Sequence, residues 1–214
     1  NYDRANSLLS LGLDHYWRFK MVRCLKAGTH NILDACCGTG SSSYSFYKAS
    51  GRNAHVFGID FSPKMLEKAK KRYAHFAPHL KFGFSDALNL DFEDNFFDAV
   101  TIAYGIRNIT ERGKALAEFY RVTKAGGKLI CLEFGYPQNG LVGWAYGLYL
   151  NLVLINLGGL LSKNRAAYAY LVKSIREFPP SFQFLEVIKA AGYQKVEVLP
   201  LSMGICNLYL AYKG

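Results

Sequence analysis

The chain has 214 residues, half of them apolar and a fifth charged, which suits one domain with a sizeable buried core, or one domain with a lid. This composition excludes an intrinsically disordered chain and a small protein held together by disulfides. Lys and Arg number 26 against 16 Asp and Glu, so the formal net charge of +10 favours an anionic partner: nucleic acid, anionic lipid or an acidic small molecule.

Strand-like and helix-like segments alternate along most of the chain, after a helical stretch at about residues 1–26. The predicted strands are short, apolar and bounded by turns, and they cover 31–35, 54–60, 80–84, 98–104 and 128–134. Helices are predicted between them at 41–50, 63–76 and 111–124. Ser62-Pro63 is a good helix start, and Lys124 followed by Gly126-Gly127 is a good helix stop. The alternation predicts an α/β fold with a parallel sheet covered on both faces.

The C-terminal part of the chain follows a different pattern. Two strands are predicted at 195–201 and 206–212, and the four residues between them leave no room for a helix. We therefore expect a hairpin, which adds an antiparallel strand to the sheet. The whole of 1–214 is expected to form a single domain.

An apolar insert at about 135–180 lies between two predicted core strands. Residues 134–162 carry no charged side chain over 29 positions, a length that is enough to span a bilayer. Asn151, Asn156, five glycines between 140 and 159, and the position of the insert inside an α/β pattern argue against a span. We expect a buried or interfacial cap over a lipophilic ligand. The alternative is an additional pair of core helices.

The cysteines indicate a reducing compartment. There are five, with Cys36 and Cys37 adjacent and no C-x-x-C pair, so neither a disulfide framework nor a metal site is expected. No signal peptide is visible among the first residues. We therefore expect a cytoplasmic location.

A glycine-rich turn directly after the first predicted strand is the most informative local motif. It reads Asp34-Ala-Cys-Cys-Gly38-Thr39-Gly40 and differs from both G-x-G-x-x-G and a P-loop. Asp60 ends the second strand, where a carboxylate accepts from ribose hydroxyls, and Asp86 follows the third, where it can accept from an adenine amino group. The alternatives are turn glycines, a helix-capping Asp60 and a turn-forming Asp86. Together the motifs predict a nucleoside site at the carboxyl ends of the strands.

These residues resemble the Rossmann-like class I S-adenosylmethionine-dependent methyltransferases. Further blocks resemble the menaquinone and ubiquinone biosynthesis C-methyltransferases, the demethylmenaquinone methyltransferase family, over essentially the whole chain. They are Tyr2-Asp3-x-x-Asn6, G-L-x-x-x-W-R at 12–18, F-D-A-V-T-I-x-x-G-I-R-N at 97–108, Y-R-V-x-K-x-G-G at 120–127, L-E-F at 132–134 and A-Y-x-Y-L-x-x-S-I-R-x-F-P at 167–179. The resemblance implies a mostly parallel seven-stranded sheet and methylation of a ring carbon of a polyprenyl quinol, with demethylmenaquinol as the first candidate.

The resemblance also implies a set of residues that bind S-adenosylmethionine. Thr39 and its flanking glycines would contact the methionine part, Asp60 the ribose, and Asp86 with Ala87 the adenine. The full set is Asp34, Gly38, Thr39, Gly40, Asp60, Phe61, Met65, Asp86, Ala87 and Ala103. Ala103 stands where the family often has Ser, Ser41 where it often has an acidic residue, and Tyr-Leu-Ala-Tyr at 209–212 replaces its usual H-R-G-Y. These departures concern the choice of quinone more than the cofactor.

Four residues are predicted to serve the methyl transfer itself. Arg107 would stabilise the phenolate form of the quinol, and Asn108 would position a water or hydroxyl or cap a helix. Glu133 is a candidate base or water-holder, with a role in binding or capping as the alternative. Tyr168 would line the pocket or only pack, and Tyr2 with Asp3 would close over it. No metal is implied.

The charge and the insert suggest where the enzyme works. Because polyprenyl quinones reside in membranes, we expect peripheral binding to the inner face of the membrane through basic residues near 18–26 and 64–72, with the insert taking the lipid tail. A homodimer is possible. No RNA-binding module or zinc knuckle supports a nucleic-acid partner. The alternatives are another small or lipophilic acceptor, a protein that binds the cofactor without turnover, and a protein that does not bind it.

Overall fold

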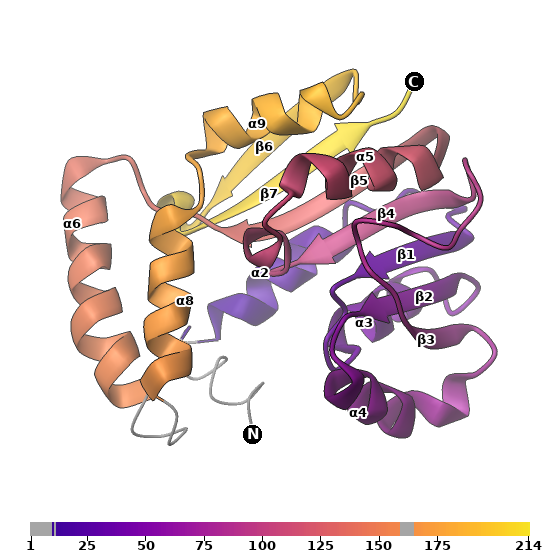
Figure 1. Cartoon of the computed structure of the whole chain (residues 1–214), viewed down its shortest axis with the longest axis horizontal. Coiled ribbons are helices and arrows are strands. Elements are labelled where there is room, and N and C mark those ends of the chain that lie inside the picture. The colour runs from indigo at the N-terminus through magenta and orange to yellow at the C-terminus, as the bar shows by residue number, and fades with distance from the viewer. Residues whose placement is uncertain (1–9, 11, 159–164) are drawn as a thin grey trace.

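A seven-stranded sheet forms the centre of the molecule. The computed structural model describes residues 10, 12–158 and 165–214, and the sheet order is β3-β2-β1-β4-β5-β7-β6 (Figure 1). The strands are β1 (Asn31–Ala35), β2 (His55–Asp60), β3 (Leu80–Phe84), β4 (Phe97–Ala103), β5 (Thr123–Phe134), β6 (Lys195–Leu201) and β7 (Cys206–Tyr212).

The predicted hairpin is confirmed and supplies the antiparallel strand. β3, β2, β1, β4 and β5 pair in parallel, whereas β7 runs antiparallel to both β5 and β6. A short turn of 3-10 helix, η4 (Ser202–Gly204), connects β6 to β7. The order of the first five strands brings the carboxyl ends of β1, β4 and β5 side by side, which is where open parallel sheets bind ligands.

Helices cover both faces of the sheet because the apolar side chains of each strand alternate between the faces. Ile32, Ile130 and Leu132 pack against one set of helices, while Leu33 and Cys131 pack against the other. The first set is α2 (Leu13–Val22), α3 (Ser41–Ala49) and α4 (Pro63–Tyr73), which is followed by a 3-10 turn, η1 (Ala74–Phe76). The second set is α5 (Arg112–Val122) and α9 (Ser181–Ala190).

The junction of α5 and β5 differs from the prediction. The glycine pair was expected to end a helix at residue 124 and a strand to begin at 128, but α5 ends at Val122 and β5 begins at Thr123. The hydroxyl of Thr123 donates to the carbonyl of Phe119 and closes the helix. Gly126, at φ 74°, then absorbs a register shift between β4 and β5. The glycines therefore form a bulge inside the strand.

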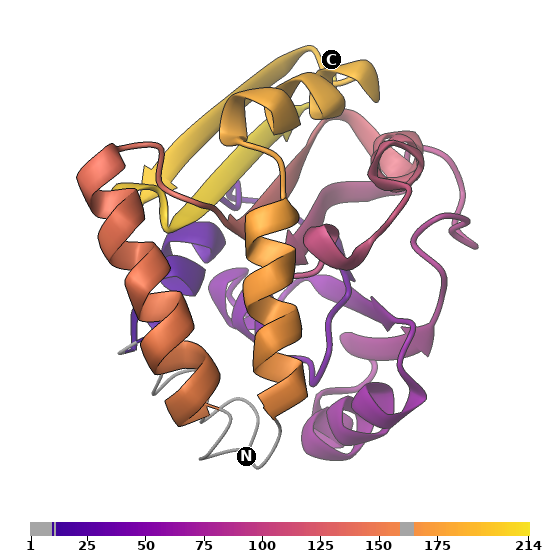
Figure 2. The same ribbon diagram turned by 60° about the vertical axis from the view of Figure 1, so that its left-hand side comes forward.

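The predicted insert contains two helical arms that stand beside the sheet edge (Figures 1 and 2). One arm is α6 (Gly140–Leu148) continued by a π-helix, η3 (Tyr149–Gly158), and the other is α8 (Arg165–Glu177). We call these arms the cap helices. They share an apolar core of their own: Tyr146, Leu150, Leu154, Tyr168, Val172 and Ile175. Among the described residues, no helix is both long and apolar enough to span a membrane.

Within the predicted N-terminal helical stretch, the helix observed is α2. Trp17 is buried on the sheet, and its indole N–H donates to Ser202 Oγ at 3.0 Å in the turn between β6 and β7. This contact fixes α2 over the carboxyl edge of the strands. Tyr2, Asp3 and Asn6, which the sequence placed near the pocket, lie outside the described residues.

Candidate active site

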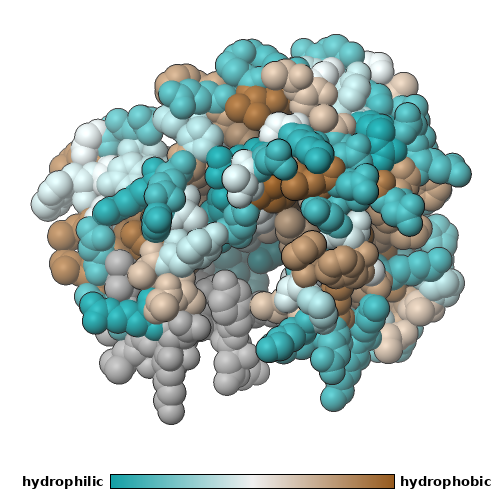
Figure 3. Space-filling model, in the orientation of Figure 1, coloured by the Kyte–Doolittle hydropathy of each residue, from teal (hydrophilic) through white to brown (hydrophobic). Residues whose placement is uncertain are grey.

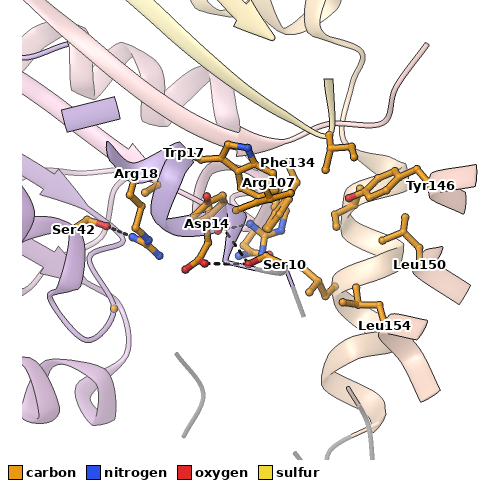
Figure 4. A pocket seen from close by; sticks show the side chains of 18 of the residues that line it. Ser10, Asp14, Trp17, Arg18, Ser42, Arg107, Phe134, Tyr146, Leu150 and Leu154 are labelled. Atoms are coloured by element: carbon orange, nitrogen blue, oxygen red, sulfur yellow. Dashed lines mark hydrogen bonds between the residues drawn. The ribbon is translucent and has the colours of Figure 1, made fainter. Parts of the chain in front are cut away.

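A cavity of about 600 Å³ opens at the carboxyl ends of β1, β4 and β5. Its walls come from α2, from the glycine-rich turn, from the loop after β4 and from the cap helices. Figure 4 shows the polar residues of α2 and the sheet edge facing the apolar residues of the cap across this space. The cavity therefore has one polar side and one apolar side.

The glycine-rich turn forms the floor of the polar side. Gly38 and Gly40 have φ of 56° and 80°, a left-handed conformation that suits glycine. At Gly40 a Cβ atom would lie 2.7 Å from the ring of Phe82, so no side chain fits there. At Gly38 a Cβ would meet nothing within 4 Å. The open space beside the Gly38 backbone lets a ligand approach the chain closely.

Asp34, predicted to bind the cofactor, does not reach the cavity. Its carboxylate lies beneath the turn and accepts hydrogen bonds from Ser43 Oγ at 2.6 Å and Thr101 Oγ1 at 2.9 Å. Burial raises the pKa of Asp34 to about 6, against the lowering effect of these two hydrogen bonds. Asp34 instead ties β1 to α3 and β4.

The predicted ribose and adenine residues lie at the carboxyl edge, outside the residues that line the cavity. Asp60 accepts from the backbone N–H groups of Gly38 and Ser62, both at 2.8 Å. Ser62 precedes α4 and makes no capping hydrogen bond with its side chain. Asp86 is exposed and accepts from the backbone N–H of Leu88, as in a turn, and Ala87 packs on the core.

Two phenylalanines stand exposed at the same edge. The ring of Phe61, a predicted cofactor residue, is 5.1 Å from the ring of Phe84, and the two residues are 67% and 60% exposed. Phe84, at the end of β3, was not predicted. The pair offers an apolar surface beside Asp60, of the kind that stacks on a flat ring.

Arg107 lines the cavity from a short 3-10 turn, η2 (Ile106–Asn108), after β4. Its Nη1 donates to Glu133 Oε1 at 2.8 Å and to the carbonyl of Tyr104, and its Nε donates to Ser174 Oγ at 3.3 Å. The guanidinium carbon also lies 5.4 Å from the centre of the Phe134 ring. Nη2 makes no hydrogen bond to any residue that the structure describes. The guanidinium is held rigidly with one nitrogen left for a ligand.

Glu133 does not line the cavity. Its side chain is completely buried, and it accepts hydrogen bonds from Arg107 Nη1, from the backbone N–H of Arg107 and from its own neighbour Phe134. A carboxylate so enclosed has no access to a substrate proton. Of the roles considered for Glu133, this contact set supports the binding and capping role, with Arg107 as the group it holds.

The other predicted residues divide between the cavity and the core. Met65, Thr39, Ala103 and Asn108 line the cavity together with Gly38 and Arg107. Asn108 is exposed, and its Oδ1 accepts from the hydroxyl of Tyr170 at 3.3 Å. Tyr168 is instead buried between the cap helices and is not among the cavity-lining residues.

The sequence interpretation missed the contribution of α2 and of Tyr104. Arg18 lines the cavity, donates to Ser42 Oγ, and lies 5.1 Å from the centre of the Tyr104 ring. Tyr104 has a φ of 59°, which is strained for a bulky residue, and its ring stacks on Phe134 at 4.7 Å. The G-L-x-x-x-W-R block contained the signal, but Trp17 was given no role at the site, and Arg18 was counted among the basic residues near 18–26 that were expected at the membrane.

The apolar side of the cavity comes mainly from the cap. Five of its lining residues belong to α6 and η3: Leu141, Tyr146, Tyr149, Leu150 and Leu154. Figure 4 shows Tyr146, Leu150 and Leu154 on one side of this helical arm. The other apolar residues that line the cavity include Leu13, Val142, Ala145, Leu171, Ile175, Met203 and Ile205. Such a surface suits a ring with an aliphatic chain.

Comparisons with known proteins are consistent across sequence and structure. Residues 1–213 match the model of the ubiE/COQ5 methyltransferase family. A relative from Clavibacter sepedonicus named demethylmenaquinone methyltransferase is 41% identical over 99% of this chain and 85% of its own length. The ubiquinone/menaquinone biosynthesis C-methyltransferase UbiE of Bartonella quintana is 38% identical over 100% and 84% of the two chains.

A solved structure shares the fold at low sequence identity. Phosphoethanolamine N-methyltransferase 2 from Haemonchus contortus, in complex with S-adenosyl-L-methionine, gives a TM-score of 0.67 at 18% identity. The match covers 92% of this chain and 52% of the other. The likeness concerns the Rossmann-like fold.

Proposed function

This chain belongs to the ubiE/COQ5 methyltransferase family, and from that membership we propose that it methylates a ring carbon of a polyprenyl quinol, demethylmenaquinol in the first place. S-adenosylmethionine is the methyl donor. The observation that carries the proposal is the cavity that joins the glycine-rich turn to an apolar cap, with Arg107 between them.

The residues at the polar side fit the cofactor. An extended nucleoside can lie along this side, over the open space beside Gly38 and against the exposed rings of Phe61 and Phe84. Gly40 keeps the turn in the shape that leaves this space, because a side chain there would meet the ring of Phe82. Gly38, Thr39 and Met65 would hold the part nearest the sulfur, and Asp60 the ribose, since each carboxylate oxygen accepts a second hydrogen bond. When bound, the cofactor supplies a methyl group activated by a sulfonium.

Arg107 prepares the acceptor. A quinol hydroxyl has a phenol-like pKa of about 10, so its ionised, electron-rich form needs stabilisation at neutral pH. The fixed guanidinium offers Nη2 to the developing phenolate, and the ion pair with Glu133 keeps it oriented before the substrate arrives. Asn108, exposed on the same turn, is placed to hold the second hydroxyl or a water.

The cap receives the lipid part of the acceptor. The cavity of about 600 Å³ is the size of a site for one drug-sized ligand, so we expect it to take the methionine end of the cofactor and the quinol ring. A long prenyl chain must then leave past the cap. Leu141, which lines the cavity, is also exposed, as are Trp144 and Leu148 of α6 and Leu152 of η3. Figure 3 shows apolar surface at the left-hand edge, where these cap helices lie. We infer that this face rests on the membrane, aided by the basic excess of the chain.

The test is mass spectrometry of the product formed from chemically reduced demethylmenaquinone and labelled S-adenosylmethionine in detergent. We expect one labelled methyl on the ring. Asp60→Ala should abolish cofactor binding, whereas Arg107→Ala should keep cofactor affinity and lose 100-fold or more in turnover. Lys114→Ala, on the exposed side of α5, serves as the control.

Each outcome separates one part of the proposal from the others. Bound cofactor without product overturns the substrate and keeps the cofactor. A protein that binds no cofactor overturns the methyltransferase assignment. Equal losses of binding and turnover in Arg107→Ala overturn the division of roles between Arg107 and Asp60.

A further inference from the structure

A second positive charge, Arg18, lies on the same polar side of the cavity as Arg107 but farther from the cap. Arg18 is in the middle of α2, and its guanidinium points away from the cap toward the first turn of α3, where Nη1 donates to Ser42 Oγ (Figure 4). No ion pair joins Arg18 to any residue within 12–158 or 165–214. The aromatic ring of Tyr104, 5.1 Å away, supports the guanidinium without neutralising it.

We propose that Arg18 binds the carboxylate of the methionine part of S-adenosylmethionine, an inference that rests on the proposed function for the presence of this cofactor. Arg18 thereby distinguishes the intact amino-acid end of the cofactor from nucleosides that lack it. Ser42 acts with it by fixing one edge of the guanidinium, which leaves the remaining N–H groups for the ligand.

The chemistry of the cofactor singles out one possible partner. At neutral pH its adenine and ribose are neutral and its sulfonium and ammonium are positive, so the carboxylate is its one anionic group. Arg18 lines the cavity beside the residues expected to hold the sulfur, Gly38 and Thr39. Asp14, one turn earlier on the same helix, lines the cavity too. The cavity side of α2 thus carries one positive and one negative side chain, which complement the carboxylate and the ammonium of an α-amino acid.

The position of Arg18 argues against a role with the quinol. Arg107, which is held by Glu133, is near the cap and the apolar side of the cavity, whereas Arg18 contacts Ser42 on the side of the glycine-rich turn (Figure 4). A phenolate bound at Arg107 therefore has its charge partner already. The competing explanation for Arg18 is structural: its contacts with Ser42 and Tyr104 would only fasten α2 to the sheet.

The experiment is a calorimetric titration of the full chain with two ligands, S-adenosylmethionine and decarboxylated S-adenosylmethionine. In Arg18→Ala and Arg18→Gln we expect the Kd for S-adenosylmethionine to rise about 10- to 100-fold, as for loss of a charge-assisted hydrogen bond. The Kd for the decarboxylated ligand should change less than twofold. Arg23→Ala, an exposed arginine at the end of the same helix, should leave both constants unchanged.

The pair of ligands distinguishes recognition from folding. If Arg18→Ala weakens both ligands equally, the arginine only supports α2 and the proposal is wrong. Unchanged binding of both ligands overturns it as well. The titration contains no quinol, so failure of the quinol assay leaves this result standing, while a wild-type chain that binds neither ligand refutes the cofactor and the inference together.

Discussion

Asp34 shows how a residue can serve the site without touching it. Its side chain is buried beneath the glycine-rich turn, and its two oxygens accept from Ser43 and Thr101. Burial raises its pKa from 3.8 to about 6. The folded state therefore binds a proton more tightly than the unfolded state, and Asp34 destabilises the fold by about 3 kcal/mol once it is ionised. This cost is absent below about pH 4 and complete above about pH 6.

We predict that Asp34→Asn removes this pH dependence. Relative to the wild type, the free energy of unfolding of the variant should rise by up to about 3 kcal/mol between pH 4 and pH 7, because the amide does not ionise. Urea unfolding at constant ionic strength measures this difference in the free energy of unfolding. Asp91→Asn, at an exposed position, is the control. A difference between variant and wild type that stays constant across this range would show that Asp34 titrates normally in the folded state.

The site residues that were predicted correctly at the cavity differ in one respect from those that lie in the core instead. Gly38, Thr39 and Arg107 lie in loops directly after strands, where chain order alone brings them to the sheet edge, and the structure places all three at the cavity. Glu133 and Tyr168 lie in a strand and a helix, where the direction of the side chain decides between cavity and core. That direction depends on packing partners, such as Arg107 for Glu133, that are distant in sequence.

At the scale of elements, the segment that leads from β5 into α6 packs closely against that helix through Tyr136. The Tyr136 hydroxyl donates to the carbonyl of Gly143 at 2.9 Å. A Cβ atom at Gly143 would lie 2.7 Å from the carbonyl oxygen of Pro137, and one at Gly147 would lie 2.6 Å from the Tyr136 hydroxyl. These glycines allow the chain leaving β5 to lie directly against the helix.

We predict that Gly143→Ala destabilises the chain by about 1–3 kcal/mol, because the contact at Gly143 is with backbone that cannot turn aside. Gly140→Ala is the matched control, since a Cβ there meets nothing within 4 Å. It should be neutral or stabilising by up to about 1 kcal/mol. Thermal unfolding compares the two variants. Equal melting temperatures would mean that the backbone around Pro137 shifts at no cost to make room for the added methyl group.

The elements themselves were largely predictable because their signals are local. The first five strands agree with the alternating apolar runs, and the hairpin followed from a connection too short for a helix. The exception was Gly126-Gly127, since a glycine pair marks a helix end or a strand bulge equally well. The pairing of β4 with the longer β5 selected the bulge. The π-helix of the cap has no sequence signature that we used.

On the scale of the whole molecule, the two tryptophans report on different regions. Trp17 is 2% exposed and packs on the sheet, whereas Trp144 is 66% exposed on α6. If the cap rests on a membrane, Trp144 enters the interfacial region, where indole rings are favoured. A change in tryptophan fluorescence on binding then reports on Trp144, because Trp17 is already buried.

We predict a blue shift of tryptophan emission when the chain meets vesicles containing anionic lipid, and its loss in Trp144→Phe. High salt should weaken the binding because it screens the net charge of +10. Phe182→Ser, at an exposed position of α9 rather than of the cap helices, should bind as the wild type does. A shift that persists in Trp144→Phe, or vesicle binding that is lost in Phe182→Ser, would place the contact elsewhere.

The adjacent thiols of Cys36 and Cys37 give the site a chemical consequence. Both line the cavity in which we propose that the methyl transfer takes place. Burial raises the pKa of Cys36 to about 12 and that of Cys37 further still. Because the thiolate and not the thiol is the nucleophile, at neutral pH both sulfurs remain protonated and unreactive. Under the proposed function, the burial that keeps these two sulfurs protonated thus protects the enzyme from methylating itself.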